Sequence, residues 1–118
     1  MNTKKIGDIG EEKAAQFLKR KGYNILDRNY RCRFGEIDII AHNKECYIFV
    51  EVKTRKDESF GRPIESISRV KISRILKTLK FYLAQNKIYD SDIRVDAIEV
   101  IMKNPKDIKI NHIENIVC

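Results

Sequence analysis

The stretch GEIDIIA at residues 35–41, followed by FVEVKTR at residues 49–55, carries the strongest structural signal in this chain of 118 residues. Both stretches are rich in Ile, Val and Phe that recur with a period of two, and this pattern predicts two β-strands. The polar residues 42–46 between them suit a hairpin turn. The two stretches together therefore predict an antiparallel pair of strands.

The register of this hairpin places acidic side chains opposite one another. If the hairpin is symmetric about Lys44 and Glu45, Asp38 lies directly opposite Glu51, and strand alternation puts Lys53 on the face of Glu51. Opposed carboxylates repel and need a compensating cation. Mg²⁺ suits carboxylate oxygens and keeps open positions for water and phosphate. The residues alone leave two interpretations open, a metal site and a surface cluster of salt bridges.

Lys53 indicates the chemistry that such a metal site would serve. Its ammonium could hold a nucleophilic water or neutralise charge on a phosphate in the transition state. An aspartate followed in the next strand by Glu-x-Lys is therefore a plausible site for cleaving phosphodiesters. Exposed strands also carry alternating Glu and Lys as solvated charges, so the pattern gains weight from Asp38 in register with it and from Val50 and Val52, which alternate with it.

A third carboxylate is predicted at the first helix. Residues 10–21 have the spacing of an amphipathic helix, and Glu11 falls on the same side as Ala14, Ala15 and Leu18, whereas Glu12 falls on the other side. A buried carboxylate needs a partner. Glu11 either joins the acidic cluster or is a carboxylate at a helix start that interacts with the helix dipole.

The motifs resemble the signature of the bacterial YraN-like family of the PD-(D/E)XK endonuclease superfamily, which is similar to archaeal Holliday junction resolvases. Residues 7–15 resemble the first helix of that family, residues 22–31 its first strand and residues 94–98 its fourth strand. The superfamily pattern has Pro before the first Asp, and this chain has Ile37 there, a position that supplies no ligand.

The resemblance implies a restriction-endonuclease-like fold and a set of roles. Asp38 and Glu51 would bind Mg²⁺, or Mn²⁺, with the Val52 carbonyl as a third ligand. Lys53 would position the attacking water, and Glu11 would complete the acidic cluster. The implied activity is metal-dependent hydrolysis of structured or branched DNA. A homodimer is expected with it, because a branched substrate often requires two cuts.

The other elements are predicted by their periodicity. The order α-β-β-β-α-β-β describes an α/β domain, a mixed sheet flanked by helices with a crossover helix between the third and fourth strands. Residues 1–118 form a single domain, because this length supports one core. Besides the helix and hairpin above, we predict strands at 23–30, 93–101 and 108–116, a polar loop at 56–62, and a helix from Ile64 to Ala84 that Pro63 introduces.

The formal net charge of +7 favours an acidic partner, most commonly nucleic acid, because Lys and Arg displace counterions from phosphates. Five cations near the motifs are candidate phosphate contacts, with solvated surface charges as the alternative: Arg31, Arg33, Arg55, Lys71 and Arg74.

The long helix is open to three interpretations. Lys71, Arg74 and Lys77 are predicted to lie opposite its apolar stripe, with Val70 and Phe81 among them. This face could follow a phosphate backbone, form a subunit interface, or be solvated.

Composition narrows the class of protein. An apolar content of 42% with 35% charged residues is ordinary for a globular protein. No apolar run is long enough to span a membrane, and the amino end lacks the apolar core of a signal peptide, so a cytoplasmic protein is expected. Cys32, Cys46 and Cys118 suggest neither a disulfide framework nor a zinc site. Two alternatives to the nuclease are a non-catalytic nucleic-acid-binding module with the same fold and a scaffold that docks through the long helix.

Overall fold

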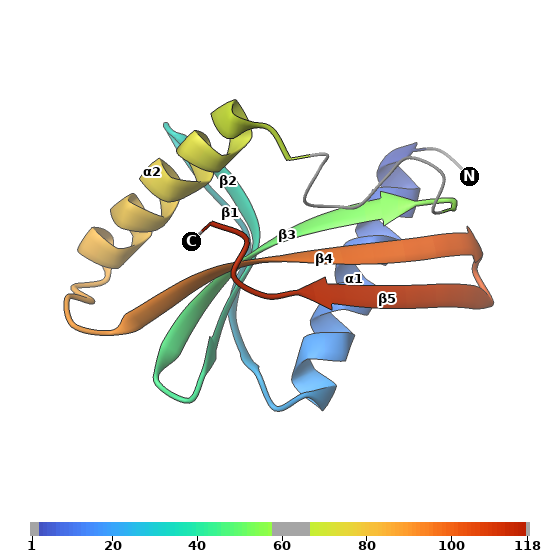
Figure 1. Ribbon diagram of the computed structural model, residues 1–118, viewed down its shortest axis with the longest axis horizontal. Coiled ribbons are helices and arrows are strands. Elements are labelled where there is room, and N and C mark those ends of the chain that lie inside the picture. The colour runs from blue at the N-terminus through green and yellow to red at the C-terminus, as the bar shows by residue number, and fades with distance from the viewer. Residues whose placement is uncertain (1–2, 58–66, 118) are drawn as a thin grey trace.

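The computed structural model describes residues 3–57 and 67–117, and these residues form two helices and five strands (Figure 1). The element order is α-β-β-β-α-β-β, which confirms the prediction. The elements are α1 (Thr3–Arg20), β1 (Asn24–Cys32), β2 (Gly35–Asn43), β3 (Cys46–Arg55), α2 (Arg69–Gln85), β4 (Asp92–Asn104) and β5 (Asp107–Ile113).

The strands form one mixed sheet in the order β1-β2-β3-β4-β5. Neighbouring strands are antiparallel except for β3 and β4, which are parallel because α2 carries the chain back between them. Lys44 and Glu45 both have left-handed backbones, with φ of 49° and 64°. This pair of angles is typical of the tight two-residue turn that joins antiparallel strands. The turn sets the register in which Ile39 pairs with Val50, as predicted.

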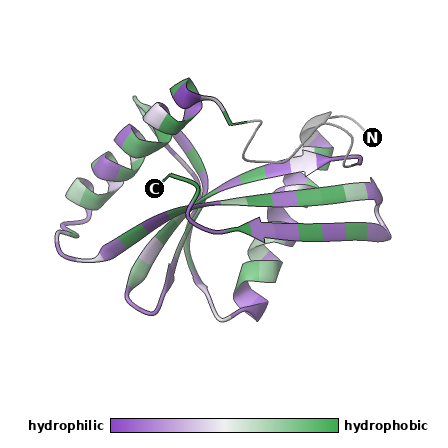
Figure 2. Cartoon of the chain, in the orientation of Figure 1, coloured by the Kyte–Doolittle hydropathy of each residue, from purple (hydrophilic) through white to green (hydrophobic). Residues whose placement is uncertain are grey.

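Each helix covers one face of the sheet. On one face, Ala14, Ala15 and Leu18 of α1 pack into a buried cluster with strand residues such as Val50. On the other face, side chains of α2 such as Leu79 pack against the opposite side of the same strands. Figure 2 shows bands of hydrophobic and hydrophilic residues along the strands. In the centre of the sheet consecutive residues such as Ile39 and Ile40 are both buried, as expected where helices cover both faces. Burial of a large aliphatic side chain contributes about 1.5–3 kcal/mol, so these two layers supply most of the stabilisation.

The helix α1 is longer than predicted, since it begins at Thr3 and not at Gly10. The sequence before Gly10 contains Gly7, which lowers helix propensity, and no acidic residue in the first turn.

No helix in the described part of the chain is long and apolar enough to cross a membrane.

The predicted start of the long helix, Ile64, lies outside the described residues, and within them the helix begins only at Arg69. Ser68 has an extended backbone, and its Oγ accepts a hydrogen bond from the backbone N–H of Lys71 (3.1 Å), so Ser68 caps a helix that begins at Arg69. Pro63 and most of the predicted loop at 56–62 lie outside the described residues. The apolar stripe of this helix is confirmed, because Ile75 and Leu79 are buried.

The last strand ends at Ile113, three residues before the predicted end. The chain leaves the sheet there because Asn115 adopts a left-handed backbone with φ of 57°. The backbone N–H groups of Asn115 and Ile116 then bond to β4, at the Asp96 carboxylate (2.9 Å) and the Val95 carbonyl (2.8 Å).

Candidate metal and phosphodiester site

The β2–β3 hairpin opens at Asp38. Pairing of the two strands runs from the turn as far as Ile39 and Val50. Two residues after Val50, the backbone N–H of Val52 donates to Oδ2 of the Asp38 side chain (2.8 Å) and not to a backbone carbonyl of β2. The Asp38 carboxylate is therefore fixed beside the backbone of β3 at Val52.

Glu11 reaches the same place from α1. The helix approaches β3 closely at Gly10, where a Cβ atom would overlap the Thr54 side chain. This contact sets Glu11 beside Asp38. Burial, the charge of Asp38 and a hydrogen bond with Asp38 raise the pKa of Glu11 to about 7. The exposed neighbour Glu12 instead pairs with Arg28 (2.7 Å) at the surface.

Glu51 is the most buried member of the group, with a side chain only 6% exposed. Burial and the nearby charge of Asp38 raise its pKa to about 7, although Lys71 and Lys53 act in the opposite direction. The Lys71 ammonium lies 3.0 Å from Glu51 Oε1. Burial, together with the charge of Asp38, therefore outweighs the effect of the two lysines on Glu51.

Lys53 lines an open cleft of about 400 Å³ together with Glu11, Asp38 and Val52. Arg31 and Asn29 form part of the same wall. The cleft thus brings together three of the four residues predicted to be catalytic, and Glu51 adjoins it through Asp38.

The donor set fits a hard divalent cation. Carboxylates with a pKa near 7 hold their negative charge poorly, and a cation beside them would restore it. Asp38, Glu51 and the Val52 carbonyl offer oxygens of the type that Mg²⁺ binds. The oxygens of Glu11, Asp38 and Glu51 do not form a group within 4.8 Å of one another. Mg²⁺ retains several waters and uses one or two carboxylates, so this wider spacing is compatible with it.

A more compact group of possible ligands lies at β4, β5 and the residue after β5. It consists of Asp96, His112 and Glu114, whose potential ligand atoms all lie within 4.8 Å of one another. Asp96 is fully buried, and each of its oxygens accepts two hydrogen bonds. Oδ1 accepts from Arg94 Nε (2.8 Å) and Asn115 N–H (2.9 Å), and Oδ2 from Arg94 Nη2 (2.9 Å) and His112 Nε2 (2.7 Å). Burial alone would raise the pKa of Asp96, but these donors lower it overall. The group already contains its cation and is structural.

Two of the predicted phosphate contacts face inward. Arg55 is 11% exposed and pairs with the buried Glu99 (3.1 Å) across the parallel strands. Lys71 was predicted to lie opposite the apolar stripe of α2, and this was wrong, because it points to Glu51. Its spacing of four residues before Ile75 was the sequence signal for the inner face.

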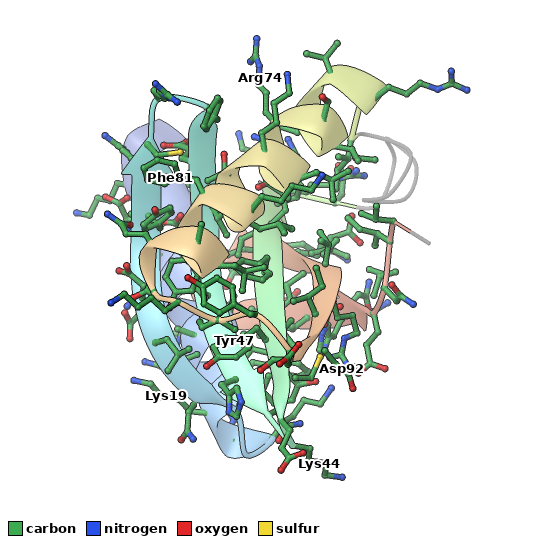
Figure 3. The ribbon with its side chains drawn as sticks, turned by 90° about the vertical axis from the view of Figure 1, so that its left-hand side faces the viewer. Lys19, Lys44, Tyr47, Arg74, Phe81 and Asp92 are labelled. Carbon is green, nitrogen blue, oxygen red and sulfur yellow. The ribbon has the colours of Figure 1, made fainter. Side chains whose placement is uncertain are left out.

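The other predicted contacts are at the surface. Arg31 is 75% exposed and pairs with Glu36 (3.0 Å). Arg33 stacks on the Phe34 ring, 4.8 Å from its centroid. Arg74 extends from α2 into solvent, and Phe81 lies further along the same helix (Figure 3). Phe81 is partly covered by the Phe34 ring (6.0 Å between centroids).

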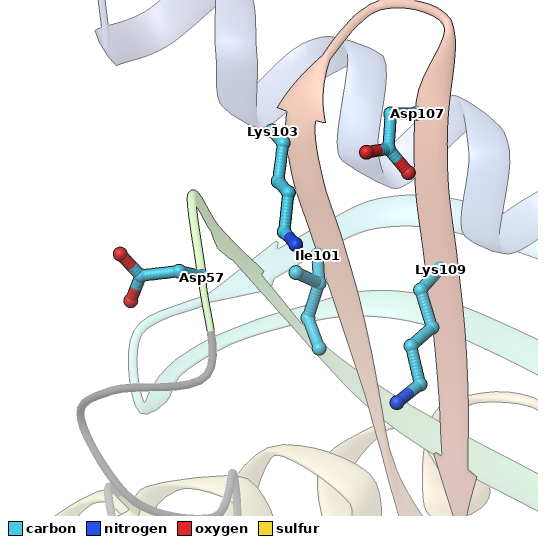
Figure 4. Close-up of a pocket in the computed structure, with 5 residues that line it drawn as sticks. All are labelled: Asp57, Ile101, Lys103, Asp107 and Lys109. Atoms are coloured by element: carbon cyan, nitrogen blue, oxygen red, sulfur yellow. The ribbon is translucent and has the colours of Figure 1, made fainter.

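A separate hollow lies at the β4–β5 hairpin (Figure 4). Its polar lining consists of two lysines, Lys103 and Lys109, and two aspartates, Asp57 and Asp107, with Ile101 between them. Among the described residues of this lining the charges are balanced, and they lack the combination of opposed carboxylates and a lysine that marks the cleft.

Comparison with known proteins gives one family. The model of the uncharacterised protein family UPF0102 matches residues 10–100, which include Glu11, Asp38, Glu51 and Lys53. The UPF0102 protein of Alkaliphilus oremlandii is 50% identical over 115 residues, covering 96% of this chain and 97% of its own. The UPF0102 protein of Clostridium acetobutylicum is 45% identical over 105 residues, covering 89% and 86%. The chain belongs to the UPF0102 family.

Proposed function

We propose that this member of the UPF0102 family is a metal-dependent endonuclease that hydrolyses phosphodiesters in structured or branched DNA, with a PD-(D/E)XK type of fold. The observation that carries the proposal is the opening of the β2–β3 hairpin at Asp38. There Glu11, Asp38 and Glu51 come together from three elements, and Lys53 lines the adjoining cleft.

Asp38, Glu51 and the Val52 carbonyl would hold Mg²⁺ or Mn²⁺, which when bound would polarise the scissile phosphate and lower the pKa of a coordinated water. The chain's own residues supply orientation. The Val52 N–H fixes the Asp38 carboxylate, since it occupies Oδ2 and leaves Oδ1 for other partners. Lys53 would orient the attacking water and offset charge that develops on the phosphate.

Nucleic acid is the substrate class that the charges favour. The chain carries a net charge of +7 while its cleft is acidic, so the excess of cations lies outside the cleft, where phosphates that flank the scissile one would bind. Arg31 lies at the cleft wall and is mostly exposed, so it is the cation best placed for such a contact. The preference for branched DNA, and the expected homodimer, rest on the resemblance to resolvases.

A cleavage assay tests the proposal. The purified protein would be incubated with labelled four-way junction, flap, single-stranded and duplex DNA, in Mg²⁺, in Mn²⁺ and in EDTA, with Lys53→Ala in parallel. Metal-dependent cutting that is lost in the variant supports the nuclease. Salt-dependent binding without cutting in either metal would contradict it and favour a non-catalytic nucleic-acid-binding module.

A further inference from the structure

Lys71 makes the one ion pair that links α2 to the candidate metal site among the described residues. Its ammonium lies 3.0 Å from Glu51 Oε1, and its side chain is 39% exposed while that of Glu51 is 6% exposed. One end of this pair is therefore buried and fixed, and the other is in contact with solvent.

The pair differs from the other buried ion pairs of the sheet. Asp96 and Glu99 are paired with arginines, Arg94 and Arg55, whose side chains are 24% and 11% exposed. A lysine is a flexible chain with a single compact charge, so it can leave its partner without breaking a two-pronged contact. Lys71 has more room than either arginine to do so.

Space for a second position lies next to Lys71. A hollow of about 160 Å³ between the start of β2 and the first half of α2 is lined by Gly35, Glu36, Lys71, Arg74 and Ile75. The backbone of Lys71 is held there by the Ser68 cap, so only its side chain needs to move. A phosphate in this hollow would meet Arg74 and the displaced ammonium, while the Glu36 carboxylate on its wall is paired with Arg31 (3.0 Å).

We propose that Lys71 is a resident counter-ion of the metal site, which neutralises Glu51 until a divalent cation binds and then moves toward Arg74 to hold a substrate phosphate. The inference rests on the proposed function, since it assigns Lys71 to the same site. A divalent cation on Glu51 would repel an ammonium that stayed 3 Å from the carboxylate, so the two cations compete. Lys71 is thus a positioning residue for Glu51 and a contact for substrate.

The test compares Lys71→Gln with Lys77→Gln, which removes the same charge from the exposed face of the same helix. Mn²⁺ affinity would be measured by calorimetry without DNA. Because repulsion and competition are both removed, Lys71→Gln should bind Mn²⁺ more tightly, by at least about threefold, whereas Lys77→Gln should match the unmodified protein. Lys71→Arg, which keeps the charge, should show no such gain.

A second measurement separates counter-ion from scaffold. Binding of a four-way junction in Ca²⁺ should weaken in Lys71→Gln more than in Lys77→Gln, because only Lys71 would reach a phosphate beside the site. Unchanged or weaker Mn²⁺ binding by a folded Lys71→Gln would overturn the inference and leave Lys71 as a support for Glu51. The expected Mn²⁺ gain together with no cleavage by any variant would support the counter-ion and overturn the nuclease. Absence of Mn²⁺ binding in all variants would overturn both.

Discussion

The groups around Asp96 and Asp38 are each centred on an aspartate of the same sheet, but their charges are compensated in opposite ways. Asp96 accepts four hydrogen bonds, two of them from Arg94, and its pKa is lowered. Asp38 sits between Glu11 and Glu51, and the pKa of each of these neighbours is raised to about 7. The negative charge of Asp96 is thus compensated by protein groups, whereas the three carboxylates around Asp38 are not fully compensated.

The difference separates a structural role from a functional one. A buried carboxylate that is fully hydrogen-bonded stabilises the connection it makes, here between β4, β5 and the residues that follow. Carboxylates with strongly raised pKa values in or beside a cleft, such as Glu11 and Glu51, suggest a site for a ligand that brings positive charge. The Asp96 group is the tighter of the two, so our proposal of a metal site near Asp38 rests on charge compensation and not on compactness.

The largest expected effect is on the Asp96 group. Asp96→Ala leaves Arg94 without its main partner, so the free energy of unfolding should fall by about 3–5 kcal/mol. Since the pKa of Asp96 is lowered in the folded state, its contribution is present above its ordinary pKa of 3.8 and is lost as the pH falls below it. Urea denaturation at neutral pH measures the loss. A stable variant would show that the group is not structural.

The next effect is on activity at the Asp38 group. Asp38→Ala, Glu51→Ala and Lys53→Ala should each lower metal-dependent cleavage by about 10²–10³-fold or more while the fold is kept. Circular dichroism and cleavage rates test both statements. Glu12→Ala, beside Glu11 but exposed and paired with Arg28, is the matched control and should cut normally. Cleavage retained in all three site variants would contradict the catalytic roles proposed for Asp38, Glu51 and Lys53.

A smaller effect is expected on stability at the same group. The folded state raises the pKa of Glu51 from 4.5 to about 7, so it favours the protonated form. The metal-free protein should therefore lose stability as the pH rises from about 4.5 to 7. Glu51→Gln removes this loss and should be more stable than the unmodified protein at pH 8 by about 1–3 kcal/mol. Glu11 titrates in the same direction and remains in the variant, so part of the pH dependence should remain.

The control for that prediction is the same comparison at pH 4, where Glu51 is protonated in both states and the gain should vanish. Addition of Mg²⁺ at pH 8 should raise the stability of the unmodified protein and not that of the variant, because binding to the folded state stabilises it. A gain that is independent of pH would indicate a packing effect and not relief of charge.

The smallest effect on stability is expected at the surface cations. Arg31→Gln removes an exposed pair with Glu36 and should change the free energy of unfolding by less than about 1 kcal/mol. It should nevertheless weaken DNA binding and reduce the slope of log affinity against log salt concentration by about 1. Arg55→Gln, at a buried pair, should show the reverse: loss of stability with an unchanged salt slope. Binding titrations at several salt concentrations separate the two.

Sequence reasoning predicted the hairpin and its register because both depend on local rules. Strand alternation and a tight turn at Lys44 and Glu45 are enough to fix the register as far as Ile39 and Val50. Asp38 and Glu51 follow these residues and lie near one another, although the strands no longer pair there. Helical periodicity was enough to turn Glu11 inward. These are short-range properties of the chain, and they supplied most of the candidate site.

The remaining features depend on contacts between distant segments. The hydrogen bond from the Val52 N–H to the Asp38 side chain requires the two strands to separate. No residue pattern in the sequence predicts this separation. The Asp96 group joins β4 to residues beyond the end of β5, so it forms only once the sheet is complete. Lys71 was predicted on the outer face of α2 because it is charged, although its spacing from Ile75 favours the inner face. An inward lysine is favourable here because it pairs with the buried Glu51.

The most direct test of the two carboxylate groups is to locate the bound metal. Backbone amide resonances of the protein would be followed by NMR during addition of substoichiometric Mn²⁺, which broadens nearby signals. The expected result is that the Asp38, Val52 and Lys53 signals are lost first and those of His112 and Glu114 only at higher Mn²⁺, because His112 lies two strands from Val52. Early loss of the His112 and Glu114 signals, or uniform broadening across the sheet, would contradict a metal site at the opening of the β2–β3 hairpin.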